Sequence, residues 1–88
     1  MTPLRLRMLQ DMRIRNFTQN TQRSYLEQVS RFARHFGRSP EELGPDEVRA
    51  YQIYLLEVRK LSAKSRSIAA AALRFLYKLN NHRLKPVG

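Results

Sequence analysis

The chain of 88 residues contains no cysteine, so it can form neither a disulfide nor a thiolate metal site. Long apolar segments are also absent. The longest uninterrupted apolar run is residues 68–73, which is far short of the ~20 residues that a membrane-spanning helix needs. The N-terminus lacks the apolar stretch of a secretory signal. We therefore expect a cytoplasmic protein, and the length allows one domain.

Acidic residues are scarce, because seven Asp and Glu oppose seventeen Lys and Arg, which leaves a formal net charge of +10. Five of the seven acids lie between residues 41 and 57, and none follows Glu57. Charge that served only solubility would not be segregated in this way. A small, strongly basic domain favours a polyanionic partner, with nucleic acid the commonest and a membrane surface the second.

Enzymatic motifs are missing from the chain. The two histidines, His35 and His82, lie far apart, and neither an HExxH or GxSxG motif nor a glycine-rich phosphate loop is present. The acidic pairs at residues 41–42 and 46–47 fall at helix starts, where the helix dipole explains them. We expect no catalytic residue, no metal site and no cofactor, so the chain by itself is predicted not to be an enzyme.

Four segments carry apolar residues at the spacing of an amphipathic helix, and none alternates as a β-strand would. The expected helices cover residues 3–15, 19–36, 45–60 and 62–79, with a helical turn at residues 39–43. Thr2, Thr18 and Ser62 are predicted N-caps. Gly37 stands where a left-handed residue would end the second helix. The sequence thus predicts an all-α fold of four helices.

The apolar stripes of these helices define the expected core. Its members are Leu4, Met8, Leu9, Met12, Tyr25, Val29, Phe32, Phe36, Val48, Tyr51, Leu55, Val58, Ile68, Ala72, Phe75, Leu76 and Leu79. Polar residues at helical spacing flank the second and fourth stripes and are expected to face water. They are Ser24, Gln28, Arg31 and His35 on the second helix, and Lys64, Ser67, Arg74 and Lys78 on the fourth. The fourth helix is expected to fray near residues 80–81.

Two of the predicted helix starts, residues 18–24 and 62–67, are rich in Ser, Thr, Asn, Gln, Arg and Lys. Backbone N–H groups at a helix start bind phosphate, and Arg, Gln and Asn can read base edges in a major groove. Either start alone is explained as an ordinary capped and solvated turn. Two of them in one basic domain favour DNA binding.

The residues also resemble a known family. Residues 17–25 (FTQNTQRSY) and 32–36 (FARHF) are similar to the second helix of the core-binding domain of tyrosine recombinases. Leu43-Gly44-Pro45, with Val48, Tyr51 and Leu55, resembles its third helix, and residues 61–65 and 73–77 resemble its fourth. The resemblance covers about residues 3 to 83. The order and spacing of these motifs resemble phage-integrase, Xer-type and integron-type enzymes.

This resemblance implies a compact, orthogonal, SAM-like bundle of four helices in residues 1–83, followed by a linker stub in residues 84–88. Such a domain clamps one face of a recombination site in DNA integration or recombination, as for a mobile element. The catalytic arginines, histidines and tyrosine nucleophile of the family lie in a separate C-terminal domain. Accordingly, no tyrosine here, Tyr77 included, is expected to be the nucleophile.

In the family pattern, the second and fourth helices present their N-terminal halves to the major groove. Carried over by position, the DNA-binding residues are Thr21, Gln22, Arg23, Ser24, Gln28, Lys64, Ser65, Arg66 and Ser67. The expected partners are double-stranded DNA and the C-terminal catalytic domain of the parent chain, with no membrane. Alone, the chain is expected to be monomeric, and oligomerisation is expected only for the full-length protein on DNA.

Two other functions compete with DNA binding. The chain could be a stand-alone helical protein-interaction module that pairs through Ile53, Tyr54 or Tyr77, which fall off the core stripes. It could also bind membrane surfaces through basic amphipathic helices. The apolar faces of the four helices are expected to pack on one another, which disfavours the membrane alternative.

Overall fold

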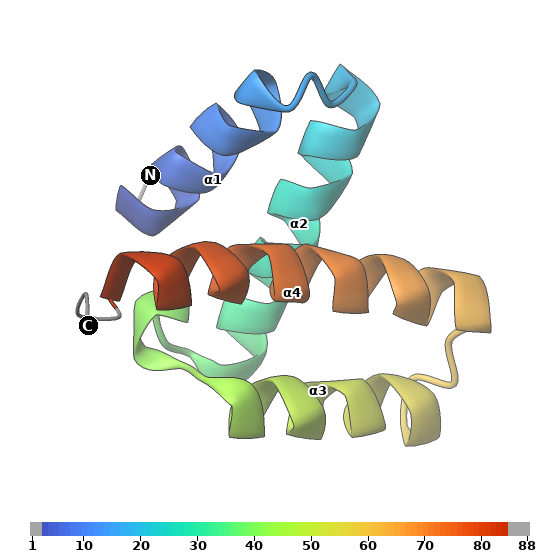
Figure 1. Ribbon diagram of the computed structural model, residues 1–88. Helices are drawn as coiled ribbons and strands as arrows, with labels where there is room; N and C mark the ends of the chain where they lie inside the picture. The colour runs from blue at the N-terminus through green and yellow to red at the C-terminus, as the bar shows by residue number, and fades with distance from the viewer. Residues whose placement is uncertain (1–2, 85–88) are drawn as a thin grey trace.

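The computed structural model describes residues 3–84, and side chains through residue 78. Its helices are α1 (Pro3–Ile14), α2 (Gln19–Phe36), α3 (Pro45–Glu57) and α4 (Ala63–Leu84), and a short 3-10 helix, η1 (Pro40–Glu42), leads into α3. Helix α4 lies across the centre, with α3 along one side, α1 along another and α2 crossing behind (Figure 1). Within residues 3–84 no strand occurs, so the predicted all-α, SAM-like bundle of four helices is confirmed.

The helix ends follow local chemistry. The hydroxyl oxygens of Thr18 and Ser62 each accept a hydrogen bond of 3.2 Å from the backbone N–H three residues later. Gly37 adopts a left-handed conformation with φ of 66°, as the end of a helix requires. These predictions are confirmed. The predicted cap Thr2 lies outside the described residues.

The predicted end of the third helix is wrong. Helix α3 ends at Glu57 rather than at residue 59 or 60, because Lys60 takes up a left-handed conformation with φ of 51°. The N–H of Leu61 then donates to the carbonyl of Leu55 at 3.0 Å, which closes the helix in the way that a glycine usually does. Val58 therefore lies beyond the helix and is 66% exposed, not buried as predicted.

Helix α4 is longer than predicted. It continues to Leu84, whereas it was expected to fray near residues 80–81. The predicted core residue Leu79 lies outside the described side chains, and residues 85–88 of the predicted linker stub lie outside the described backbone. On the same helix, Ile68 and Phe75 are only half-buried, whereas Ala69 and Leu73 are almost or fully buried. Ala72 and Leu76 are fully buried as predicted, so the buried stripe of α4 is displaced toward Ala69 and Leu73.

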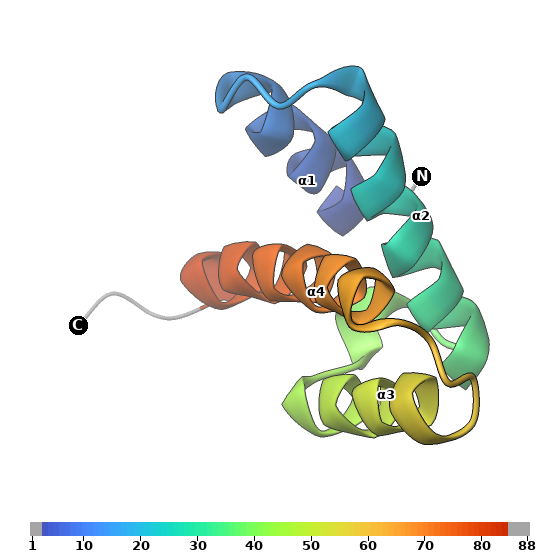
Figure 2. The ribbon, with the colours of Figure 1, turned by 90° about the vertical axis from the view of Figure 1, so that its right-hand side faces the viewer.

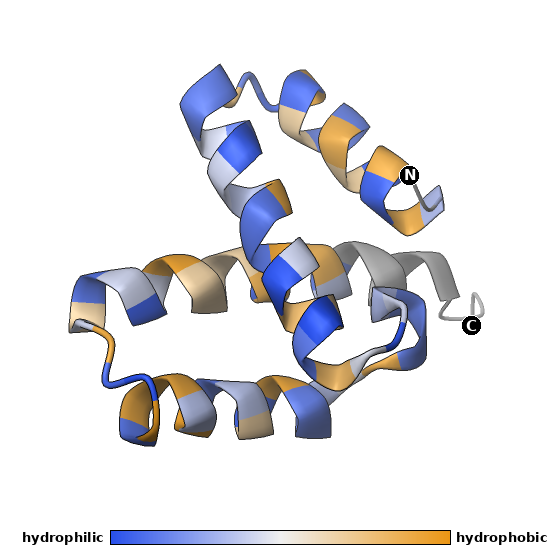
Figure 3. Ribbon diagram, turned by 180° about the vertical axis from the view of Figure 1, so that it is seen from behind, coloured by the Kyte–Doolittle hydropathy of each residue, from blue (hydrophilic) through white to orange (hydrophobic). Residues whose placement is uncertain are grey.

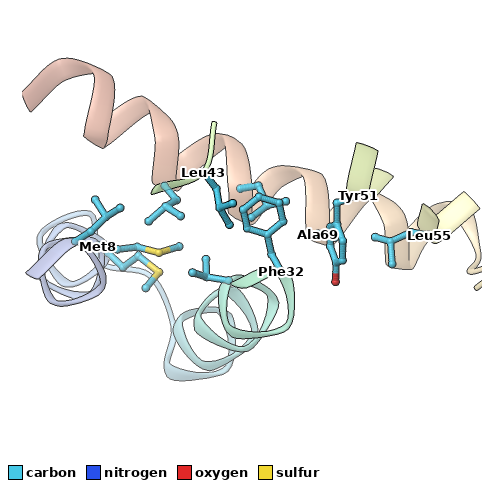
Figure 4. Close-up of a cluster of buried hydrophobic side chains, with 11 residues drawn as sticks. Met8, Phe32, Leu43, Tyr51, Leu55 and Ala69 are labelled. Atoms are coloured by element: carbon cyan, nitrogen blue, oxygen red, sulfur yellow. The ribbon is translucent and has the colours of Figure 1, made fainter. Parts of the chain in front are cut away.

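Side chains from all four helices form one core (Figure 4). The buried members are Leu4, Met8, Met12, Val29, Phe32, Leu43, Tyr51, Leu55, Ala69, Ala72, Leu73 and Leu76. Helix α4 contacts each of the other three helices, and two of its buried positions are alanines. These small side chains allow close approach of the neighbouring helices, as the run of four alanines suggested.

Aromatic side chains connect the helices within this core. The ring of Phe32 lies 5.3 Å from that of Tyr51 and 6.2 Å from that of Tyr77, which joins α2 to α3 and α4. The Tyr77 hydroxyl donates a hydrogen bond of 2.8 Å to the carbonyl of Pro40, and burial raises the pKa of this hydroxyl. Tyr77 is therefore part of the structural framework that holds η1 against α4.

Candidate nucleic-acid interface

Helices α2 and α4 begin with the same arrangement of hydrogen bonds. The carbonyl oxygen of Phe17 accepts from Gln22 Nε2 at 2.8 Å, and the carbonyl oxygen of Leu61 accepts from Arg66 Nε at 3.2 Å. In the same two helix starts, the cap hydroxyls donate hydrogen bonds to a hydroxyl three residues later. Thr18 donates to Thr21 at 3.0 Å, and Ser62 donates to Ser65 at 3.2 Å. Residues 17–22 and 61–66 thus repeat one pattern, namely apolar, hydroxyl, any two residues, hydroxyl, donor.

Both helix starts are polar in the sequence, as predicted. The matching order of residue types in residues 17–22 and 61–66 was not predicted. Its consequence is that Gln22 and Arg66 are held against the chain's own backbone and are partly buried. Arg66 uses only Nε in this bond, so its two terminal amino groups keep their donors. The side chain is fixed by the fold and still able to bind an anion.

A groove of about 590 Å³ lies between α2, the C-terminal part of α3 and the beginning of α4. We call it the α2–α4 groove. Figure 2 faces the end of the molecule where α4 begins and shows the three helices that line the groove. Its lining residues are Ser24, Gln28, Arg31, Arg34, His35, Tyr51, Tyr54, Leu55, Arg59, Leu61, Ser65 and Ile68. The four polar residues predicted to flank the second helix are all among them.

The structure brings only some of the nine predicted DNA-binding residues together. Ser24, Gln28 and Ser65 line the groove. Thr21, Gln22 and Arg66 stabilise the two helix starts through the hydrogen bonds described above. The side chains of Arg23, Lys64 and Ser67 are exposed on the first turns of α2 and α4 without lining the groove.

Three arginines, Arg31, Arg34 and Arg59, line the groove, and no acidic residue does. Arg31 forms an ion pair of 2.6 Å with Glu27, and both side chains are about half exposed. Exposed pairs of this kind stabilise a helix by only about 0.3–0.5 kcal/mol, so Arg31 can exchange this partner for another anion. Neither Arg34 nor Arg59 was selected from the sequence. For Arg59 the reason is that only the packing of α3 on α4 places it opposite α2.

The groove has an aromatic wall. The imidazole of His35 lies 4.4 Å from the ring of Tyr54 and 5.2 Å from that of Tyr51, measured between centroids. Burial raises the pKa of the Tyr51 hydroxyl, which keeps it neutral. Tyr54 is thus half-buried by contacts within the chain, and of the three residues suggested for protein pairing only Ile53 is exposed.

A second depression of about 740 Å³ lies between the first part of α3 and the later part of α4. Arg74 and Lys78, two residues of the predicted wet stripe of α4, line it. It is the larger of the two, but Val48, Leu73 and Tyr77 make much of its wall apolar, and it contains none of the nine predicted residues. The α2–α4 groove is therefore the better candidate interface.

Two kinds of site find no support in the described part of the chain. Within residues 3–84, no group of three or more His, Cys, Asp and Glu side chains could hold a metal ion. In the same residues, no helix is both long enough and apolar enough to cross a bilayer.

Comparison with known proteins identifies the family of the chain. Residues 4–83 match the family described as phage integrase, N-terminal SAM-like domain. The chain is 55% identical over 83 residues to a protein of Sinorhizobium fredii (strain NBRC 101917 / NGR234) named "Putative integrase/recombinase y4qK". The alignment covers 94% of this chain and 27% of that relative, so the chain spans about a quarter of the relative's length. No solved structure matches the chain significantly.

Proposed function

Because the chain belongs to the N-terminal SAM-like domain family of phage integrases, we propose that it is the DNA-binding domain of a site-specific recombinase. In this proposal it grips one face of a duplex during DNA integration or recombination, in the cytoplasm. The observation that carries the proposal is the α2–α4 groove, where polar side chains from α2 and α4 meet three arginines and no acid. The chemistry would belong to a C-terminal catalytic domain of the parent protein.

Two classes of contact follow from the groove. Arg31, Arg34 and Arg59 are suited to phosphate oxygens, because a guanidinium offers a fork of donors. Ser24, Gln28 and Ser65 carry no charge and are suited to base edges, where amides and hydroxyls both donate and accept. Phosphate contacts would fix the register of the domain on the duplex, and the uncharged residues would supply its sequence preference.

The proposal is tested by measuring duplex binding by fluorescence anisotropy over a series of salt concentrations. The logarithm of the binding constant should fall with the logarithm of salt by about 0.9 for each phosphate neutralised. Arg34→Ala should weaken binding to all duplexes and reduce that slope by about 1. Gln28→Ala should instead change the preference among sequences, with little effect on the slope.

A matched control lies on α4. Lys64 and Lys78 are both exposed lysines on this helix, and their offset of 14 residues separates them by roughly 21 Å along the helix axis. Lys64→Ala, next to the groove, should weaken binding more than Lys78→Ala, in the second depression. Binding that ignores salt, or equal effects of the two lysines, would contradict the proposal.

A further inference from the structure

The outward face of α3 is more apolar than a solvated helix face needs to be. Ile53 and Leu56 remain 44% and 47% exposed, while Tyr51 and Leu55 on the opposite side are buried in the core. Helix α3 forms one edge of the molecule (Figures 1 and 2). Apolar residues of α3 are also visible from behind (Figure 3). Ile53 and Leu56, three residues apart on one helix, form the apolar centre of this face.

Charged residues surround these two side chains in a particular order. The exposed residues along this outward face are Asp46, Arg49, Ala50, Ile53, Leu56, Glu57 and, just after the helix, Lys60. From one end to the other, the charges read acid, base, apolar centre, acid, base. Neither Arg49 nor Glu57 forms an ion pair with another described side chain. Both are therefore available to a partner.

We propose that this face binds the same face of a second copy of the chain, with the two α3 helices antiparallel and a two-fold axis at Ile53. In such a pair, each residue opposes the one equally far beyond Ile53 in the other copy. Arg49 then opposes Glu57, and Ala50 opposes Leu56. Within the helix pair, both Arg49 and Glu57 meet an opposite charge, and Ile53 meets Ile53. A parallel pair in the same register would instead place like charges against each other.

The proposed contact leaves the α2–α4 groove free. The groove uses Tyr51, Tyr54 and Leu55 of α3, which lie on the inward side of the helix, and none of the seven residues of the outward face. A single helix pair buries well under the ~1,200 Å² of a standard stable interface. Association of the isolated domain is thus weak, in keeping with the expected monomer, and becomes effective where copies are held close together. The contact between the two α3 helices is independent of the proposed DNA-binding function.

Disulfide trapping tests the position of the axis, because the chain contains no cysteine. Ile53→Cys places a single thiol on the axis, where two copies bring their side chains together. Gln52→Cys is the matched control, since residue 52 is also exposed but lies about 100° around the helix. Under mild oxidation, the first variant should form covalent dimers at least tenfold faster. Equal rates for the two variants would overturn the proposal.

Charge exchange tests the register independently. Arg49→Glu alone and Glu57→Arg alone each place like charges opposite one another, so sedimentation velocity should show less self-association than for the unaltered chain. A mixture of the two variants restores every pair between unlike copies and should associate about as well as the unaltered chain. The substituted side chains are exposed, so folding is expected to be retained, and circular dichroism verifies it. A mixture that associates no better than its components would refute the register.

Discussion

Arg66 offers a test of how the beginning of α4 is stabilised, because its side chain is bound to the chain's own backbone. Its Nε donates to the carbonyl of Leu61 at the beginning of α4, at 3.2 Å. Replacing Arg66 with alanine removes this bond and leaves the carbonyl oxygen of Leu61 without its side-chain donor. An intramolecular hydrogen bond contributes about 0.5–1.5 kcal/mol. In a domain of this size, a loss of about 1 kcal/mol lowers Tm by about 4–8 °C.

The companion substitution is Arg66→Gln. At the equivalent position of α2, Gln22 makes the same bond to Phe17 at 2.8 Å, so glutamine fits this geometry. Thermal unfolding followed by circular dichroism should show a lowered Tm for Arg66→Ala and one close to the unaltered chain for Arg66→Gln. Lys64→Ala, at an exposed position, should stay within about 0.5 kcal/mol. The reasoning is refuted if alanine and glutamine at position 66 have the same Tm.

Three further predictions concern the framework. Phe32→Ala should destabilise the domain by about 3–5 kcal/mol in urea unfolding, because a fully buried ring that contacts Tyr51 and Tyr77 is lost; Phe32→Leu should cost clearly less. Gly37→Ala should cost roughly 1 kcal/mol in the same assay through its φ of 66° alone, since no atom lies within 4 Å of an added Cβ. Burial raises the folded-state pKa of the Tyr77 hydroxyl. The contribution of the neutral hydroxyl to stability is therefore fully present below the unfolded pKa near 10, and it declines as the pH rises above that value. Between pH 9 and 11, the free energy of unfolding should therefore fall less for Tyr77→Phe than for the unaltered chain.

The sequence predicted the fold well where local signals were strong. Thr18, Ser62 and Gly37 end their helices as expected, because a hydroxyl at an N-cap and a glycine at a left-handed position act through neighbouring backbone atoms. The end of α3 was missed because Lys60, a residue without glycine's preference for this conformation, takes the left-handed position. Helical periodicity also located the buried face of α4 only to about one residue.

The candidate site was predicted in part. Ser24, Gln28, Arg31 and His35 share one side of α2, and their spacing alone made this visible. Arg59 and Tyr54 joined them only through the packing of α3, which no local pattern encodes. For Gln22 and Arg66, the resemblance implied DNA contacts, whereas the structure gives both a hydrogen bond within the chain. Family position thus pointed to two helix starts without separating structural side chains from exposed ones.

The most direct test of the central claim is a titration of the isotopically labelled domain with a DNA duplex, followed by NMR. If the α2–α4 groove binds DNA, amide shifts should change first along it, at Ser24, Gln28 and Ser65. Amides on the outward face of α3, at Ile53 and Leu56, should change little at low protein concentration. Changes confined to α3 or to the second depression, with the groove unaffected, would show that the groove is not the DNA-binding surface.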